Sequence, residues 1–271
     1  METDRKPGGV IVIPARYASS RYPGKPLAPI RGASGAAQPL IARTIAAAHA
    51  ARRDLPLHVA TDDARIAEAV RTLGEAPVMT PEHCANGTER VAAAIEALAI
   101  TPDYVINFQG DALLTPPDFV TALAAWMEDH PDCAVATVAM HCSATVYTHL
   151  LADQAAGRSG GTTVITDAAG RALYFSKRVL PFLPEPPQDG TNPVLLHLGL
   201  YAYRPEALRR YPALAPSPAE QAEGLEQLRF LHHGIPIDVI ALAAPGWDPI
   251  ELNNPTDLAP IEATLAARGI A

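Results

Sequence analysis

A group of cations and hydroxyls follows the first hydrophobic segment of the chain. Residues 10–13 are consecutive, uncharged and β-branched, which predicts a buried strand. Four prolines between residues 14 and 29 prevent that strand from continuing, because proline donates no backbone hydrogen bond. The loop after the strand carries Arg16, Ser19, Ser20, Arg21 and Lys25. Open α/β sheets bind ligands at the carboxyl ends of their strands, and guanidinium groups match phosphate oxygens, so we expect this loop to bind an anion such as phosphate.

A single carboxylate, that of Asp111, follows a second hydrophobic segment, VINFQGD (105–111). If both segments are neighbouring strands, this carboxylate points into the same crevice as the basic loop. Mg²⁺ prefers one or two carboxylates together with phosphate and water, so the pair of features indicates a nucleoside triphosphate with magnesium. An aspartate after a glycine is also common in ordinary turns, and a basic loop can simply be solvated. The chain lacks GxxxxGK[ST] and GxGxxG, which disfavours P-loop and dinucleotide-binding folds.

The composition narrows the possible partners. The chain has 271 residues, 48% of them hydrophobic, and a net charge of −8, which disfavours general attraction to nucleic acid or to an anionic membrane. No apolar run reaches the roughly 20 residues of a membrane helix, and the amino terminus is too polar for a signal peptide. Three cysteines without metal-ligand spacing favour reduced thiols. We therefore expect a cytoplasmic protein.

The elements that would hold these residues alternate between strands and helices. The hydrophobic patterns predict strands over 10–13, 55–60, 77–80, 103–111 and 133–140, and helices over 63–74, 87–98 and 116–130. Such alternation predicts an α/β fold with a mostly parallel sheet covered on both faces.

The pattern changes after residue 150. It predicts a hairpin over 162–182 that turns at 167–170, strands over 194–204 and 235–242, and helices over 218–234 and 254–269, the last one capped by Asn254. We expect one domain over 1–271, with a β-rich insertion at about 160–205.

Seven separated segments, taken in order, resemble the motifs of one enzyme family. They are IPARYASSRYPGKPL (13–27), VATDDARI (59–66), GTERV (87–91), FQGD (108–111), ALYFSK (172–177), HLGLYAYR (197–204) and LEQLR (225–229). The chain resembles the CMP-Kdo synthetases, the 3-deoxy-manno-octulosonate cytidylyltransferases, over nearly its full length. The resemblance implies a Rossmann-like nucleotidyltransferase sheet, CTP, Mg²⁺, and a homodimer formed partly through the β-rich insertion.

The resemblance also implies roles for individual residues. It implies that catalysis depends on Arg16, Lys25 and Asp111, and that Arg16 and Lys25 bind the triphosphate. Nucleotide binding would also involve Pro14, Ala15, Ser19, Ser20, Arg21, Asn86, Gly87 and Gln109. The acceptor would contact His197, Tyr201, Glu226 and Gln227, and Mg²⁺ would be held by Asp111 and Asn253. For the acceptor residues the sequence alone also allows structural roles. His197 and Tyr201 alternate with apolar residues along a strand, and Glu226 could be a solvated helix residue.

Three positions depart from the family pattern. QGDAL replaces QGDEP, so that Ala112 and Leu113 follow the metal aspartate, and CANGT replaces HxSGT at 84–88. LNNPTDL places Asn253 where the family has a second metal-binding aspartate. An asparagine still offers a carbonyl oxygen but removes one negative charge, which Asp248 or Glu251 could supply instead.

These departures leave three hypotheses about function. The first is a cytidylyltransferase in which an oxygen of a Kdo-like sugar acid attacks the α-phosphorus of CTP and pyrophosphate leaves. The second is the same reaction with a small phosphonate, because fewer carboxylates at the metal would better tolerate a dianion. The third is a catalytically impaired protein that binds nucleotide. Retention of Arg16, Lys25, Gln109 and Asp111 favours an enzyme.

Overall fold

The computed structural model describes residues 8–18, 22–52, 54–185, 187 and 192–271. The predictions for Ser19, Ser20 and Arg21 therefore lie outside the described residues.

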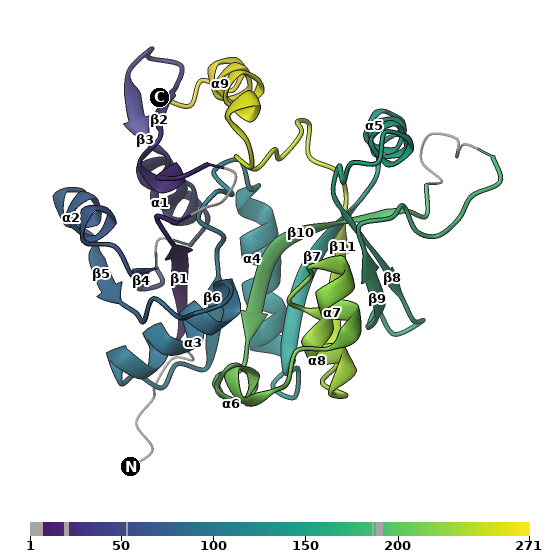
Figure 1. The fold of residues 1–271 in the computed structure, drawn as a ribbon, viewed down its shortest axis with the longest axis horizontal. Helices are drawn as coiled ribbons and strands as arrows, with labels where there is room; N and C mark the ends of the chain where they lie inside the picture. The colour runs from purple at the N-terminus through teal and green to yellow at the C-terminus, as the bar shows by residue number, and fades with distance from the viewer. Residues whose placement is uncertain (1–7, 19–21, 53, 186, 188–191) are drawn as a thin grey trace.

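A mixed sheet forms the centre of the molecule (Figure 1). In the described part of the chain it contains nine strands, of which seven follow the order β11-β7-β10-β6-β1-β4-β5. These seven are β1 (Gly9–Ala15), β4 (Leu57–Thr61), β5 (Ala76–Met79), β6 (Tyr104–Asn107), β7 (Val135–His141), β10 (Leu195–Tyr203) and β11 (Ile237–Leu242). Every pairing along this order is parallel except those of β10, which runs antiparallel to β6 and β7. The expectation of a mostly parallel sheet is confirmed.

Helices cover both faces of the sheet. The side chains of β1 alternate between two cores: Val10 and Val12 belong to one, and Ile11 and Ile13 to the other. The first core is completed by α3 (Gly87–Leu98) and α8 (Leu228–His232), and the second by α1 (Leu40–Arg52), α2 (Ala64–Thr72) and α4 (Pro117–Asp129). Because both faces are buried, β1 reads as a continuous hydrophobic run.

Several predicted elements need correction. The expected strand over 103–111 ends at Asn107, and the following residues form the turn that carries Asp111. The expected helix over 218–234 is wrong, because α7 (Pro218–Glu223) ends at Gly224, whose φ of 62° is left-handed, before α8 begins. The sequence analysis also missed α1, α5 (Ala144–Ala155) and the short hairpin of β2 (Pro29–Arg31) and β3 (Ala37–Pro39).

The remaining elements lie in the second half of the chain, apart from a single-turn 3-10 helix, η1 (Lys25–Leu27). They are α6 (Pro205–Arg210), η2 (Tyr211–Ala213), η3 (Pro255–Asp257) and α9 (Leu258–Ala267). Asn254 and Asp257 form a capping box at η3, which agrees with the predicted helix cap at Asn254. In the described ranges we find no helix that is both long and apolar enough to cross a membrane.

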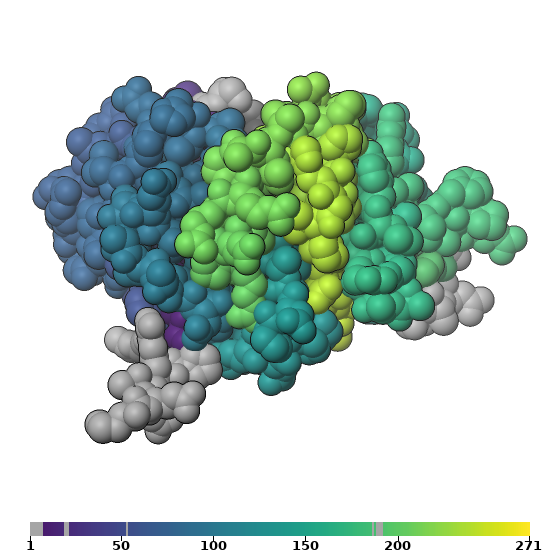
Figure 2. Space-filling view, turned by 90° about the horizontal axis from the view of Figure 1, so that it is seen from below, coloured from purple at the N-terminus to yellow at the C-terminus, as the bar shows by residue number. Residues whose placement is uncertain are grey.

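The β-rich segment is divided between two places. β8 (Thr162–Thr166) and β9 (Ala172–Ser176) form the predicted hairpin, which is attached to the first half of β10. β10 itself is a central strand, so the range 160–205 includes part of the main sheet as well as the hairpin. The segment 177–185, which follows β9, protrudes at the end of the molecule opposite α2 (Figures 1 and 2). Its Phe182 is 85% exposed.

Candidate active site

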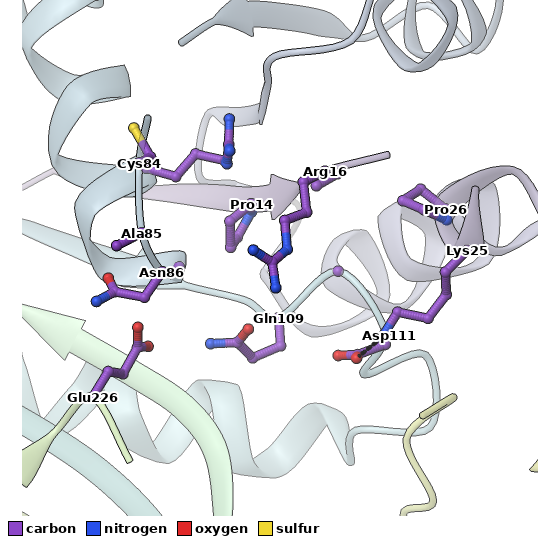
Figure 3. Close-up of a pocket in the computed structure, with 14 residues that line it drawn as sticks. Pro14, Arg16, Lys25, Pro26, Cys84, Ala85, Asn86, Gln109, Asp111 and Glu226 are labelled. Carbon is purple, nitrogen blue, oxygen red and sulfur yellow. Dashed lines mark hydrogen bonds and ion pairs between the residues drawn. The ribbon is translucent and has the colours of Figure 1, made fainter. Parts of the chain in front are cut away.

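A cavity of about 360 Å³ opens at the carboxyl ends of β1 and β6 (Figure 3). Its lining comprises Pro14, Ala15, Arg16, Lys25, Pro26, Cys84, Ala85, Asn86, Gly87, Arg90, Gln109, Gly110, Asp111 and Glu226. This is the position at which open α/β sheets bind ligands. The cavity therefore brings together nine of the residues singled out from the sequence.

The basic loop begins where β1 ends. Arg16 is exposed, and Figure 3 shows its guanidinium directed into the cavity. Gly24 adopts a left-handed φ of 72° and donates its N–H to the Tyr17 carbonyl at 2.9 Å. This turn places Lys25 at the start of η1, where its Nζ lies 2.5 Å from Oδ2 of Asp111.

The turn that carries Asp111 is held tightly against β1. The Phe108 N–H donates to the Val12 carbonyl at 3.0 Å, and the Thr44 hydroxyl donates to the Gly110 carbonyl at 3.0 Å. A Cβ on Gly110 would lie 2.6 Å from the carbonyl oxygen of Pro14, so only glycine allows this close approach. The sequence analysis missed the role of Thr44, because α1 was not predicted.

The amino terminus of α3 forms the opposite wall. The Asn86 side chain caps this helix by accepting the Glu89 N–H at 2.9 Å, and its amide donates to the Tyr211 hydroxyl at 3.1 Å. Helix amino termini carry a partial positive charge that stabilises anions. This wall is therefore electrostatically suited to a phosphate group or a carboxylate.

Arg90 is a cavity residue that the sequence analysis did not select, although it lies in the GTERV motif. Its side chain is 3% exposed, and its guanidinium contacts the Asp62 carboxylate and the Thr80 hydroxyl, each at 2.7 Å. Asp62 belongs to the VATDDARI motif. The ion pair thus fixes two of the quoted motifs to each other beside the cavity.

Of the four predicted acceptor residues, Glu226 alone belongs to the lining of this cavity. Glu226 lines the cavity, and burial raises the pKa of its carboxyl group. Among the described residues, the lining excludes His197, Tyr201 and Gln227, which are 9%, 3% and 4% exposed.

His197 and Tyr201, the two residues of this set that lie on β10, are surrounded by other parts of the protein. His197 Nε2 lies 3.1 Å from the Thr137 hydroxyl, and burial lowers the pKa of its imidazole to about 3, so the ring is neutral near pH 7. The Tyr201 hydroxyl is buried and has no hydrogen-bond partner in the described part of the chain. An acceptor could reach these two residues only if the side chains around them moved.

The carboxy-terminal segment approaches the Asp111 turn. The Leu252 N–H donates to the Asp111 carbonyl at 3.4 Å, and the Asn253 N–H donates to the Asp257 carboxylate at 2.9 Å. Glu251 Oε1 would lie 3.4 Å from a Cβ on Gly199. Asn253 and Glu251 are therefore beside the turn, although neither lines the cavity as described.

The available donors suit a metal that also binds substrate. No group of three or more His, Cys, Asp or Glu side chains that could hold a metal ion occurs among the described residues. Ala112 and Leu113, which replace Glu and Pro of the family pattern, are buried and add no oxygen ligand. One carboxylate beside phosphate oxygens and water is a usual environment for Mg²⁺, and Asp111 fits it.

Comparisons with known proteins agree with this geometry. The family model of the cytidylyltransferases matches residues 10–237. The 3-deoxy-manno-octulosonate cytidylyltransferase of Maricaulis maris is 42% identical over 95% of this chain and 97% of its own length. That of Dichelobacter nodosus is 42% identical over 93% and 96%.

Solved structures give the same result. The structure of CMP:2-keto-3-deoxy-manno-octonic acid synthetase complexed with CTP matches with a TM-score of 0.80 and 35% identity, covering 96% of this chain and 99% of that one. A cytidylyltransferase from Leptospira borgpetersenii, with 11% identity and a TM-score of 0.52, shares the fold.

Proposed function

The chain belongs to the CMP-Kdo synthetase family of cytidylyltransferases and is a nucleotidyltransferase; on this premise we propose that it transfers CMP from CTP to the sugar acid Kdo with release of pyrophosphate. The observation that carries the proposal is the single cavity that holds Arg16, Lys25, Asp111 and Glu226 at the carboxyl ends of β1 and β6. It combines cations for a triphosphate with a carboxylate for a hydroxylated acceptor.

The reaction requires positioning and charge neutralisation. An acceptor hydroxyl oxygen forms a bond to the α-phosphorus of CTP and releases its proton to solvent, while the bond from that phosphorus to the β-phosphate bridging oxygen breaks and pyrophosphate leaves with the bonding electron pair. Lys25 and Arg16 would neutralise the triphosphate and the leaving pyrophosphate. By analogy with other preorganised charge-stabilising groups, loss of either cation would lower the rate by about 10²–10³.

Asp111 is the residue that would hold Mg²⁺. A bound Mg²⁺ supplies positive charge to the phosphate oxygens and orients them. Glu251 and Asn253 flank Leu252, whose N–H bonds to the Asp111 carbonyl, so either is a candidate for a second oxygen ligand. Asp111 also pairs with the Lys25 ammonium, which supports a position of that cation beside the proposed phosphate site.

The two other hypotheses drawn from the sequence, a phosphonate acceptor and an impaired nucleotide-binding protein, are less well supported. The relatives named above carry Kdo in their names, so they give no support to a small phosphonate as acceptor. The reading as an impaired nucleotide-binding protein is disfavoured by the family membership and by the cations and the carboxylate that line one cavity.

A homodimer and a cytoplasmic location are part of the same proposal. The protruding segment exposes Phe182 and the hairpin exposes Leu173, which is 59% accessible. Exposed apolar side chains on a projecting hairpin are suited to a contact between copies. Analytical ultracentrifugation of the wild type and of a Leu173→Asp, Phe182→Asp double variant would test the dimer.

The test of the function is pyrophosphate release from CTP and Mg²⁺ with Kdo, a sialic-type acid and small phosphonates in parallel. We expect the wild type to release pyrophosphate with Kdo and Lys25→Gln to lose most of this activity. Lys177→Gln, a matched change of an exposed lysine, should lose none of it. Release with a phosphonate and silence with Kdo would overturn the proposal.

A further inference from the structure

The carboxylate of Glu226 is held by a residue that does not itself line the cavity. Thr88, the second residue of α3, donates its backbone N–H to Glu226 Oε2 at 3.4 Å, and its hydroxyl lies 3.2 Å from Oε1. Thr88 is 1% exposed. Both contacts use the helix terminus, whose first N–H groups have no partner within the helix.

The hydroxyl of Thr88 is itself oriented from the centre of the sheet. It lies 3.0 Å from the Tyr203 hydroxyl of β10, and the Asn107 amide of β6 donates to that hydroxyl at 3.5 Å. A carboxylate accepts hydrogen bonds and donates none, so Thr88 donates to Glu226 and accepts from Tyr203. The chain of donors therefore runs in one direction, from Asn107 through Tyr203 and Thr88 to Glu226.

Burial makes this arrangement rigid. Asn107, Thr88 and Tyr203 are 0%, 1% and 1% exposed, so water cannot replace any member of the chain. The Thr88 and Tyr203 hydroxyls each have partners on both sides, and such paired buried groups fix one another's orientation; Asn107 Oδ1 has no hydrogen-bond partner among the described residues. Two groups of Thr88 therefore orient the Glu226 carboxylate toward the cavity. One is the backbone N–H, and the other is the hydroxyl, which Tyr203 itself orients.

We infer that Thr88 is a positioning residue that orients Glu226 to accept a hydrogen bond from a hydroxyl of the acceptor, and so favours a polyhydroxylated sugar acid. This inference rests on the proposed function, in which Glu226 faces the acceptor. Thr88 donates two hydrogen bonds to this carboxylate, and the other lone pairs of its oxygens can accept from a donor in the cavity. A hydroxyl gains from this contact, whereas a second anionic group beside the carboxylate is repelled.

The experiment compares Thr88→Val, which removes the hydroxyl at nearly constant volume, with Thr88→Ser, which keeps it. The Michaelis constants of Kdo and of CTP are measured separately. Thr264→Val is the control, because the Thr264 hydroxyl donates to the Pro260 carbonyl of its own helix α9 at 2.9 Å. We expect the constant for Kdo to rise about tenfold in Thr88→Val, which corresponds to about 1.4 kcal/mol, and that for CTP to stay within about twofold. Thr88→Ser restores the wild-type value, and Tyr203→Phe gives a smaller rise of the same kind.

Equal changes for Kdo and CTP, or a Thr88→Ser variant as impaired as Thr88→Val, would overturn the inference. A silent wild type overturns the proposed function instead. In that case the melting temperatures of Thr88→Val, Glu226→Ala and the double variant decide on the contact alone. A double-variant decrease smaller than the sum of the single decreases supports it, and additive decreases refute it.

Discussion

Replacing Asp111 by asparagine is expected to strengthen the binding of metal-free CTP and to weaken the binding of CTP in the presence of Mg²⁺. Lys25 Nζ is paired with Asp111 Oδ2 at 2.5 Å, and the two side chains are 17% and 18% exposed. A triphosphate that arrives without metal must take Lys25 away from this carboxylate. With Mg²⁺, the carboxylate exchanges one cation for another, and the ammonium becomes available to phosphate.

The size of the effect follows from the geometry. Two unit charges 2.5 Å apart attract by about 2 kcal/mol in a water-like medium and by about 7 kcal/mol at an effective dielectric constant of about 20. Because both groups are partly solvated, the net value falls nearer that of a hydrogen bond to a charged group, about 1.5–3 kcal/mol. Asp111→Asn should therefore bind metal-free CTP about 10- to 100-fold more tightly than the wild type.

Isothermal titration calorimetry with CTP, in EDTA and in MgCl₂, measures both affinities. Asp118→Asn makes the same change of net charge on an exposed residue at the start of α4 and should leave both values unchanged. If Asp111→Asn binds metal-free CTP no more tightly than the wild type, the carboxylate does not restrain Lys25 and the reasoning is refuted.

Three further predictions concern the fold that surrounds the cavity. Gly110→Ala should lower turnover at least about tenfold, because its Cβ would meet the Pro14 carbonyl at 2.6 Å and displace the turn; unaltered kinetics would contradict this. Arg229→Met should reduce the free energy of unfolding by about 3–5 kcal/mol in urea titrations, since it leaves the Glu220 carboxylate, 2.6 Å away and 11% exposed, without its partner; a change below about 1 kcal/mol would show that the pair is not needed. The pKa of His197 is about 3 in the folded chain and near 6.5 when unfolded, so the unfolded chain binds the additional proton as pH falls. The contribution of His197 to the free energy of unfolding is therefore complete above pH 6.5 and decreases by about 1.4 kcal/mol per pH unit below it. The loss of stability between pH 7.5 and pH 5 should be smaller by about 2 kcal/mol in His197→Gln than in the wild type. Equal pH dependence in both proteins would argue against a neutral buried imidazole.

The meeting of the basic loop with the Asp111 carboxylate could be predicted from local sequence. Hydrophobic runs at 10–13 and 104–106 stop abruptly, and the cations and the carboxylate follow within a few residues. Parallel strands bring their carboxyl ends to one edge of a sheet, so the order of these residues along the chain already places them together. The Lys25–Asp111 pair is the result.

The direction of β10 could not be predicted. Its residues are apolar on both faces, which is the pattern of any strand buried between two layers, whether parallel or antiparallel. Only the pairing of Tyr201 with Asn107 and of Tyr203 with Val105 determines that it runs against β6. The break at Gly224 has a similar origin, because a glycine within a helical pattern ends a helix only when the next segment packs elsewhere.

The sequence by itself determined which side chains lie at the ends of the first strands and therefore what chemistry the crevice can hold. The tertiary structure decided which of the suggested acceptor residues reach it. Glu226 lines the cavity, whereas His197 and Tyr201 are covered by neighbouring elements. Alternation along a strand tells on which face a side chain lies, but its exposure depends on what packs over that face, and those elements come from distant parts of the chain.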